Sequence, residues 1–235
     1  MSSSQFVTAS TNYEQTLISE SYQVDNQKIK QINPGVDYEL FVPDQSIHRE
    51  NIFLSIGRIQ QQKGQLETLR FLNSFKEVET DFMCYFVGGP SGSSGDEYLS
   101  ELKESVKELS LSSHVEFLGN LPQVDIRNLL NSAKLLIHTS QYETFGLVAI
   151  EANSMGVPVL TTNNGSMQEI ITNKENGYLV DGLDYQDVSI SIKNLINDDQ
   201  YFEERMINCM NKSKDYKWEN TVDKLLDLYQ EAKFS

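Results

Sequence analysis

Short apolar runs alternate with longer amphipathic stretches from Asn51 onward, and this alternation constrains the fold more than any other feature of the sequence. Runs of this kind are typical of strands that are buried on both faces. The stretches between them place apolar residues three to four positions apart, as at Leu99, Leu102 and Val106, which is typical of helices that cover a sheet. The pattern predicts an α/β fold in which a parallel sheet carries helices on both faces.

The predicted elements place several loops at one edge of this sheet. Strands are expected at 52–56, 82–87, 114–118, 134–138, 157–161 and 178–180, and helices at 65–75, 96–109, 124–133, 147–155, 167–172, 185–196, 200–212 and 218–232. Ligands of parallel sheets bind at the carboxyl ends of the strands. We therefore expect one shared site, formed by the loops that follow residues 56, 87, 118, 138 and 161.

The chain before residue 51 holds fewer elements. We expect an apolar patch at 5–9, a helix at 12–22 capped by Ser10 or Thr11, a strand at 28–32, a turn at 33–37 and an irregular linker at 38–50. These elements are too few to bury their own apolar faces, so this part is not expected to be a domain by itself.

The segment 134–160 combines a strand, a loop, a helix and a second strand, and its two glutamates have seven residues between them. Glu143 lies in the loop, and Glu151 lies one turn inside the helix, which is expected to begin near Gly146 and Leu147. The unpaired amides and the dipole of a helix N-terminus favour a phosphate, whereas carboxylates accept hydrogen bonds from sugar and ribose hydroxyls. A nucleotide-sugar would satisfy both requirements.

A plainer alternative is that Glu143 caps the helix and Glu151 is an ordinary solvated residue. A capping box does not explain the pair, because Thr144 as N-cap would need an acid or amide at the position of Leu147. Phe145, in the same loop, is expected to be an exposed aromatic residue.

Arg58 and Lys63 lie in the loop 57–64, which follows a predicted strand and begins and ends with glycine. Two cations at this place would neutralise a diphosphate, Arg58 through its planar fork and Lys63 as a point charge. The alternative for either residue alone is a solvated surface cation. Their position at the same sheet edge as Glu143 favours the site.

Other motifs indicate no further chemistry. The glycine- and serine-rich loop 88–95 has the spacing of neither dinucleotide- nor P-loop-type phosphate motifs, so it is expected to be a flexible connection at the edge of the site. His48, His114 and His138 have no metal-ligand spacing, and no metal site is expected. His138 ends a strand just before the key loop, which leaves both a ligand-facing and a structural role open.

The net charge of −15 argues against a nucleic-acid partner. No apolar run approaches the roughly 20 residues of a membrane span, and the N-terminus has neither the basic nor the apolar region of a signal peptide. Cys84 and Cys209 stand outside any motif and are expected to be buried thiols in a reducing compartment. The expected location is the cytoplasm.

Several motifs together resemble the retaining GT-B glycosyltransferases of family 4, also called glycosyl transferases group 1. They are the run from Ser140 to Ala152 with its two glutamates, Gly57-Arg58 with Lys63-Gly64, Gly156-x-Pro158-Val159, Gly165 with Glu169, Asn176-Gly177, and the segment 33–37, which is similar to the crossover between the two domains. The resemblance covers nearly the whole chain. The runs VGGPSG and LVAIEA are most similar to the branch of sucrose-phosphate synthases and inositol-phosphate N-acetylglucosaminyltransferases.

This resemblance implies that the chain is the C-terminal, Rossmann-like half of a GT-B fold and that the N-terminal domain is largely absent. It divides the chain into a remnant of the N-terminal domain with the crossover linker (1–46), a nucleotide-sugar-binding domain (47–217) and a C-terminal helix that returns towards the N-terminal domain (218–235). Because that domain is missing, Tyr13, Tyr22, Leu225 and Tyr229 are expected to be partly exposed. The family often has two glycines where this chain has Gly165-Ser166.

The resemblance also implies roles for individual residues. Arg58 and Lys63 would hold the diphosphate and stabilise the leaving group, Glu143 would engage hydroxyls of the donor sugar, and Glu151 would accept from the ribose. The catalytic set is Arg58, Lys63 and Glu143, and the donor-binding set is Gly57, Arg58, Lys63, Gly119, Phe145, Gly146, Leu147, Val148 and Glu151.

The implied activity is transfer of a hexose from a UDP-, GDP- or ADP-sugar with retention of configuration, without a tightly bound cofactor. The acceptor would be a sugar, a polyol or a lipid-linked molecule. The isolated chain is expected to bind nucleotide but to transfer sugar slowly or not at all, since a missing N-terminal domain or partner subunit would supply the acceptor site. The alternatives are a non-catalytic nucleotide-binding module and one subunit of a split glycosyltransferase.

Overall fold

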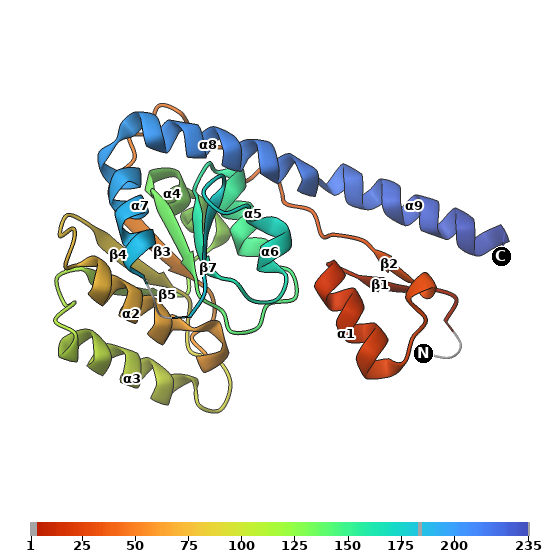
Figure 1. The fold of residues 1–235 in the computed structure, drawn as a ribbon, viewed down its shortest axis with the longest axis horizontal. Coiled ribbons are helices and arrows are strands. Elements are labelled where there is room, and N and C mark those ends of the chain that lie inside the picture. The colour runs from red at the N-terminus through yellow and green to blue at the C-terminus, as the bar shows by residue number, and fades with distance from the viewer. Residues whose placement is uncertain (1–3, 183–184, 235) are drawn as a thin grey trace.

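The alternation of strands and helices is confirmed in a computed structural model, which describes residues 4–182 and 185–234 (Figure 1). Six strands form one sheet in the order β5-β4-β3-β6-β7-β8, and every neighbouring pair is parallel. The strands are β3 (Ile52–Ile56), β4 (Met83–Val87), β5 (Val115–Gly119), β6 (Leu135–His138), β7 (Val159–Thr162) and β8 (Gly177–Val180). All six carboxyl ends therefore lie at one edge of the sheet.

Helices cover both faces of the sheet because successive strand residues point to opposite sides. Phe53 joins one buried cluster with residues of several helices, and Leu54 joins a second cluster on the other side. The first cluster draws mainly on α2 (Gln65–Phe75), α3 (Gly95–Glu108) and α7 (Gln186–Asn197), and the second on α4 (Gln123–Ser132), α5 (Leu147–Ser154) and α6 (Met167–Ile170). Helix α8 (Asp199–Ser213) follows α7, and its residue Phe202 also belongs to the first cluster.

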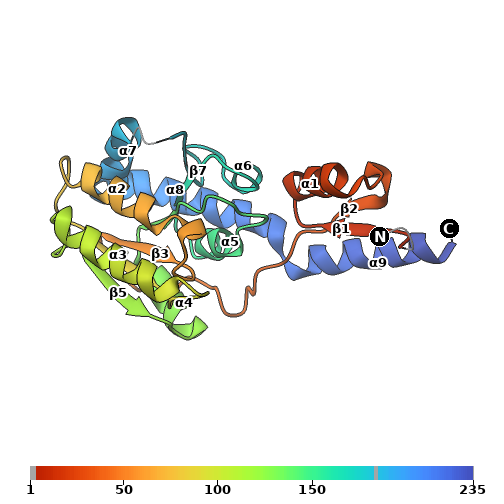
Figure 2. The same ribbon diagram turned by 90° about the horizontal axis from the view of Figure 1, so that it is seen from below.

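A small lobe lies beside the main sheet (Figures 1 and 2). Strands β1 (Val7–Ala9) and β2 (Ile29–Gln31) form a separate parallel pair, connected by α1 (Asn12–Tyr22) and a short 3-10 turn. The C-terminal helix α9 (Trp218–Phe234) extends from the main domain to this pair, which lies between α1 and α9. The predicted elements thus all exist, and their ends lie within two residues of the predicted positions. Residues 1–3, 183–184 and 235, which the three predicted divisions of the chain include, lie outside the described residues.

The start of α1 is fixed by its own cap and by the main domain. The hydroxyl of Thr11 accepts from the Glu14 amide at 3.1 Å, as the capping pattern predicts, and it donates to the Thr144 carbonyl at 2.9 Å. The carboxylate of Glu169 accepts from the amides of Asn12 and Tyr13 at 3.0 and 2.8 Å. These contacts hold the small lobe next to the loop that contains Glu143.

The small lobe leaves several large apolar side chains exposed. Tyr22 of α1 is 64% exposed and Tyr229 of α9 is 67% exposed, and Tyr13 and Leu225 are half-buried. This confirms the predicted partial exposure of these four residues. An apolar stripe on α9 (Trp218, Val222 and Leu226) is also exposed.

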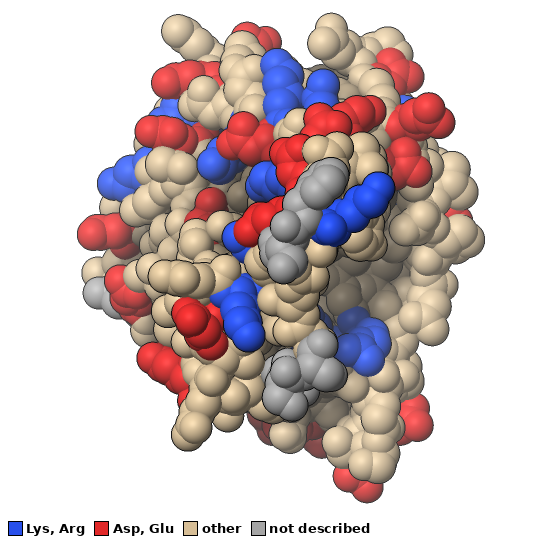
Figure 3. Space-filling view, turned by 90° about the vertical axis from the view of Figure 1, so that its right-hand side faces the viewer, with Lys and Arg blue, Asp and Glu red and all other residues tan. Residues whose placement is uncertain are grey.

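The cysteines, the apolar character of the helices and the surface charge also bear on the predictions from the sequence. Cys84 and Cys209 are buried free thiols, as predicted, and burial raises the pKa of each. Among the helices of residues 4–182 and 185–234, none has the length and apolar character that a membrane span requires. On the face shown in Figure 3, acidic side chains lie between the basic ones.

Candidate functional site

The loop 57–64, which follows β3, is joined to the loops on both sides of it. At its start, the Gly57 amide donates to the Val87 carbonyl at 2.9 Å. At its end, the Gly64 carbonyl accepts from the Thr139 hydroxyl at 2.7 Å. The loops after β3, β4 and β6 therefore meet at the carboxyl edge, as predicted.

Glycines make this close approach possible. Gly64 has a φ of +70°, and a Cβ at this position would lie 1.9 Å from the Thr139 carbonyl oxygen. A Cβ at Gly88 would lie 2.0 Å from the Gly57 carbonyl oxygen. Larger residues would force the three loops apart.

The loops after β5 and β7 complete the same edge. The Gly88 amide donates to the Gly119 carbonyl at 2.8 Å, and the Thr162 hydroxyl donates to the Ser140 carbonyl at 3.2 Å. All five loops predicted to form the site are thus connected to one another at one edge of the sheet.

Glu143 lies at the centre of this edge, between a lysine and a histidine. Its Oε2 atom is 2.8 Å from Nζ of Lys63 and 3.2 Å from Nε2 of His138. Lys63 comes from the short turn after β3, and His138 is the last residue of β6. The side chains of Glu143, His138 and Lys63 are 15%, 6% and 25% exposed, so the cluster is open to solvent mainly on the side of the lysine.

The surroundings of Glu143 favour its ionised form. Burial opposes ionisation, but the hydrogen bonds from His138 and Lys63 outweigh it and lower the pKa of Glu143 to about 2. A neutral ligand hydroxyl that approaches Glu143 thus meets a carboxylate rather than a carboxylic acid.

Helix α5 begins without a side-chain cap. Its first residue follows Gly146, which has a φ of +90°, and no side chain within residues 4–182 and 185–234 caps the start of the helix. An uncapped N-terminus leaves backbone donors and positive partial charge available to an anion. Leu147, at the start of the helix, is 42% exposed, which shows that this end faces solvent.

The prediction for Phe145 was wrong. Its side chain is only 6% exposed and packs edge-on against the ring of Tyr216 at a centroid distance of 5.8 Å. The conformation of the loop places this ring inside the second core cluster, so only the backbone of Phe145 remains for contact with a ligand. Tyr142, in contrast, is 52% exposed and lies edge-on to Tyr13.

Ser166, which stands where the family often has a second glycine, supports the Glu143 loop. It is fully buried, and its hydroxyl lies 3.0 Å from the Glu143 carbonyl and 3.1 Å from the Phe145 carbonyl. Gly165 keeps the left-handed conformation, with a φ of +61°, and a Cβ there would lie 2.6 Å from the Glu143 carbonyl oxygen. The serine thus fits this turn and adds a donor to it.

Glu151 lies one turn inside α5 and has surroundings unlike those of Glu143. Within residues 4–182 and 185–234, no donor reaches its carboxylate, and burial raises its pKa to about 7. A half-buried carboxyl group without protein donors is free to accept from the hydroxyls of a ligand.

Arg58 and two of the predicted glycines border open space. The Arg58 side chain is exposed, while its carbonyl accepts from the Gln65 side chain at 2.8 Å. A Cβ added to Gly57 or Gly119 would meet nothing within 4 Å. Both backbones can therefore be approached closely from outside.

The model of the family described as "Glycosyl transferases group 1" matches residues 39–213. The chain belongs to the glycosyl transferases group 1 family. This confirms the family that the motifs indicated, and the match includes the loops after β3 to β7 that form the carboxyl edge.

Individual relatives of this group 1 chain agree with that assignment. A "D-inositol 3-phosphate glycosyltransferase" of Corynebacterium urealyticum is 32% identical over 94% of this chain and 55% of its own length. The chain spans about half the length of the curated relatives that it matches.

Solved structures show the same fold. Anabaena Alr3699/HepE, crystallised with UDP and glucose, has a TM-score of 0.83 at 22% identity, over 98% of this chain and 63% of its own. The C-terminal domain of the group 1 protein LpcC from Francisella tularensis has a TM-score of 0.67 at 25% identity, over 78% of this chain and 99% of its own. The parallel sheet with its helices is thus the C-terminal, Rossmann-like half of a GT-B fold.

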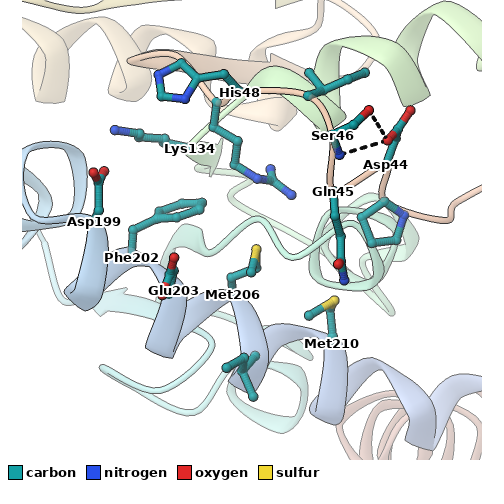
Figure 4. A pocket seen from close by; sticks show the side chains of 14 residues that line it. Asp44, Gln45, Ser46, His48, Lys134, Asp199, Phe202, Glu203, Met206 and Met210 are labelled. Carbon is teal, nitrogen blue, oxygen red and sulfur yellow. Dashed lines mark hydrogen bonds between the residues drawn. The ribbon is translucent and has the colours of Figure 1, made fainter.

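The group 1 fold of this chain also has a pocket of about 660 Å³ at the opposite edge of the sheet, between residues 43–49 and α8 (Figure 4). Arg49, which lines it, donates to the carbonyls of Leu130, Ala133 and Met155 at the ends of α4 and α5. Burial lowers the pKa of Arg49 to about 10. Because this cation is used to terminate helices, we assign its role to the fold.

The sequence did not reveal the contacts among the site residues themselves. Lys63 and Glu143 are 80 positions apart in the chain, so no local pattern links them. The contact of His138 with Glu143 places this histidine in the cluster. His114 instead stacks on the Phe82 ring at 4.6 Å. Within the described ranges, no group of three or more His, Cys, Asp or Glu side chains is arranged to hold a metal ion.

Proposed function

We propose that this chain is the donor-binding half of a retaining glycosyltransferase that takes a hexose from a nucleoside diphosphate sugar. The observation that carries the proposal is the uncapped start of α5 with a carboxyl group on either side of it, of which Glu151 has no donor among the described residues. One protein of the same fold supports uridine as the base, since Anabaena Alr3699/HepE was crystallised with UDP and with UDP-glucose.

The proposed roles follow from the position of each residue. Arg58 and Lys63 neutralise the diphosphate, and the amides of Phe145, Gly146, Leu147 and Val148 at the start of α5 contribute donors to it. Gly57 and Gly119 allow the ligand to approach the backbone. Glu151 accepts from the ribose hydroxyls, and Glu143 accepts from a hydroxyl of the donor sugar.

In the proposed reaction, the bond between the sugar carbon and the diphosphate oxygen breaks, and the oxygen of an acceptor hydroxyl bonds to the same face of the sugar. The proton of that hydroxyl passes to the departing diphosphate. Negative charge then develops on the leaving diphosphate. Arg58, Lys63 and the start of α5 stabilise this charge more strongly than that of the bound donor, which is how they would accelerate the step. No metal ion is required for this role, because the two cations and the amides supply positive charge.

The acceptor site is proposed to lie on a further segment or subunit. The half-length match to the relatives and the exposed side chains of α1 and α9 support this. We accordingly propose the division into 1–46, 47–217 and 218–235, in which the first and last parts contact that further segment or subunit. The same half-length match favours a second candidate, a nucleotide-binding module or one subunit of a split enzyme. A reducing compartment such as the cytoplasm fits the two buried free thiols.

A thermal-unfolding panel with UDP, GDP, ADP and inorganic pyrophosphate tests the donor site. A nucleotide at about 100 times its dissociation constant should stabilise the chain by about 2.7 kcal/mol. Arg58→Ala and Lys63→Ala should each weaken binding of UDP and of pyrophosphate by about 1.5–3 kcal/mol, the size of a charge-assisted contact.

Lys193→Ala is the matched control. Lys193 belongs to α7 and lies 3.9 Å from Glu79, near the start of β4 and therefore at the other edge of the sheet. The Lys193→Ala variant should bind nucleotides as tightly as the wild type. A wild-type chain that responds to none of the nucleotides would rule out the proposed donor site.

A further inference from the structure

Lys63 has one ammonium group and two candidate partners. Its Nζ atom is 2.8 Å from Oε2 of Glu143 in the free chain, while the proposed function requires it at the diphosphate of the donor. The pair is largely shielded from solvent, since the two side chains are 25% and 15% exposed. An ion pair of this kind is stronger than one on the open surface, so it opposes the transfer of Lys63 to another anion.

Glu143 has a second donor that need not move. His138 ends a central strand, its side chain is 6% exposed, and its Nε2 atom is 3.2 Å from the same Oε2 atom that Lys63 contacts. Lys63 sits on a short 3-10 turn at the rim, on a long side chain with several rotatable bonds. When an anion arrives, Lys63 is therefore the partner that can leave and His138 the partner that stays.

We propose that Glu143 is an internal anion that competes with the donor diphosphate for Lys63, and that His138 is a positioning residue that holds Glu143 in place when Lys63 moves to the phosphate. This inference rests on the proposed function, because it concerns the same nucleoside diphosphate. Departure of Lys63 leaves a lone pair of Glu143 without a partner, and a hydroxyl of the donor sugar then fills it. Binding of the diphosphate thus makes the Glu143 carboxylate available to accept a hydrogen bond from the donor sugar.

Substitution of a binding-site residue usually weakens binding, but the competition predicts that substitution of Glu143 strengthens it. Glu143→Gln keeps the shape of the side chain but removes its charge, so Lys63 should become free to bind anions. Affinity for inorganic pyrophosphate and for UDP should then increase, by about three- to tenfold for a partly shielded ion pair. Isothermal titration calorimetry on the full chain measures both ligands.

Two further variants separate the competition from a general change in charge. Glu79→Gln also removes one negative charge from an acid near a lysine, but at the other edge of the sheet. The Glu79 side chain is 17% exposed, similar to that of Glu143. The affinity of this variant for pyrophosphate should equal that of the wild type. In the double variant Lys63→Gln/Glu143→Gln, the gain from Glu143→Gln should disappear, because the lysine that it releases is absent.

The role of His138 is tested by its own pair of variants. His138→Leu leaves Lys63 as the donor that Glu143 depends on, so affinity for pyrophosphate should fall about threefold or more. His138→Gln, which retains an N–H donor, should restore part of it. In the Glu143→Gln background, His138→Leu should have no effect on pyrophosphate binding, whereas a merely structural histidine would lower affinity in both backgrounds. Circular dichroism confirms that each variant is folded.

The outcomes distinguish this inference from the function on which it rests. If the wild-type chain binds neither UDP nor pyrophosphate, the proposed function fails. If the wild type binds both but Glu143→Gln binds pyrophosphate no more tightly, or gains as much without Lys63 as with it, the competition is refuted and the donor site stands.

Discussion

Glu143 and Glu151 are the same residue type at the two ends of one short segment, and burial acts on both, yet they differ in the donors that surround them. Glu143 receives two donors on one oxygen, and its pKa is lowered to about 2 although burial opposes this. Glu151 has no donor among the described residues, and burial raises its pKa to about 7. The comparison shows that the fold satisfies the Glu143 carboxylate internally and gives the Glu151 carboxylate no donor among the described residues.

The difference has a consequence for stability. In the unfolded chain both carboxyl groups have a pKa near 4.5. The folded state therefore favours the ionised form of Glu143 and the protonated form of Glu151. One residue stabilises the fold at neutral pH, and the other destabilises it.

The largest effect is expected for Glu151→Gln. The folded-state pKa lies above the unfolded one, so the stability associated with Glu151 falls as the pH rises from 4.5 through 7. At pH 8 the variant should be more stable than the wild type by about 3 kcal/mol, and at pH 4 the two should be equal. Urea unfolding at both pH values measures this. A variant that is less stable than the wild type at pH 8 would show that Glu151 has a favourable partner in the fold.

Glu143→Gln should act in the opposite direction and somewhat less strongly, because part of its cluster is exposed to solvent. The folded-state pKa lies below the unfolded one, so the stabilisation is present above pH 4.5 and is lost as the pH falls towards 2. The variant should be less stable than the wild type by about 2 kcal/mol at pH 7, with a smaller difference at pH 3. An equal difference at both pH values would contradict the assigned ionisation.

The helices and strands could be predicted to within two residues because their signals are local. The strand at 52–56 and the helices at 12–22 and 65–75 even have the predicted bounds. The edge of the sheet that carries the site could also be predicted, since parallel pairing places all the relevant loops there.

Contacts between distant segments could not be predicted. Phe145 was expected at the surface because its neighbours in the loop are polar, but the ring of Tyr216 covers it. Glu169 and Asn12 are 157 positions apart, and nothing in either local pattern indicates that one caps the helix of the other. The difference between the two glutamates has the same origin, because it depends on Lys63 and His138.

A smaller effect is expected in the protons exchanged on binding. Ribose hydroxyls donate to the ionised form of Glu151, which is about half populated at pH 7 when its pKa is about 7. UDP binding at pH 7 should therefore release about half a proton more from the wild type than from Glu151→Gln. Calorimetry in two buffers with different ionisation enthalpies measures the difference. Equal release from both chains would mean that Glu151 does not change its ionisation.

The smallest effect concerns the support of Glu143. Ser166→Gly removes the hydroxyl that lies within hydrogen-bonding distance of the Glu143 and Phe145 carbonyls, and glycine is also more flexible in the unfolded chain. The variant should be less stable by about 1–2 kcal/mol, as urea unfolding would show, with the pH dependence of the wild type retained. A change in that pH dependence would mean that Ser166 also controls the position of the carboxylate.

The most direct test of the account compares UDP with inorganic pyrophosphate on the wild type and on Glu151→Gln by calorimetry. If Glu151 receives the ribose, the substitution should weaken UDP about tenfold or more and leave pyrophosphate unchanged, since pyrophosphate has no hydroxyl groups of a sugar. Equal weakening of both ligands, or no change in either, would contradict the assignment of Glu151 to the nucleoside.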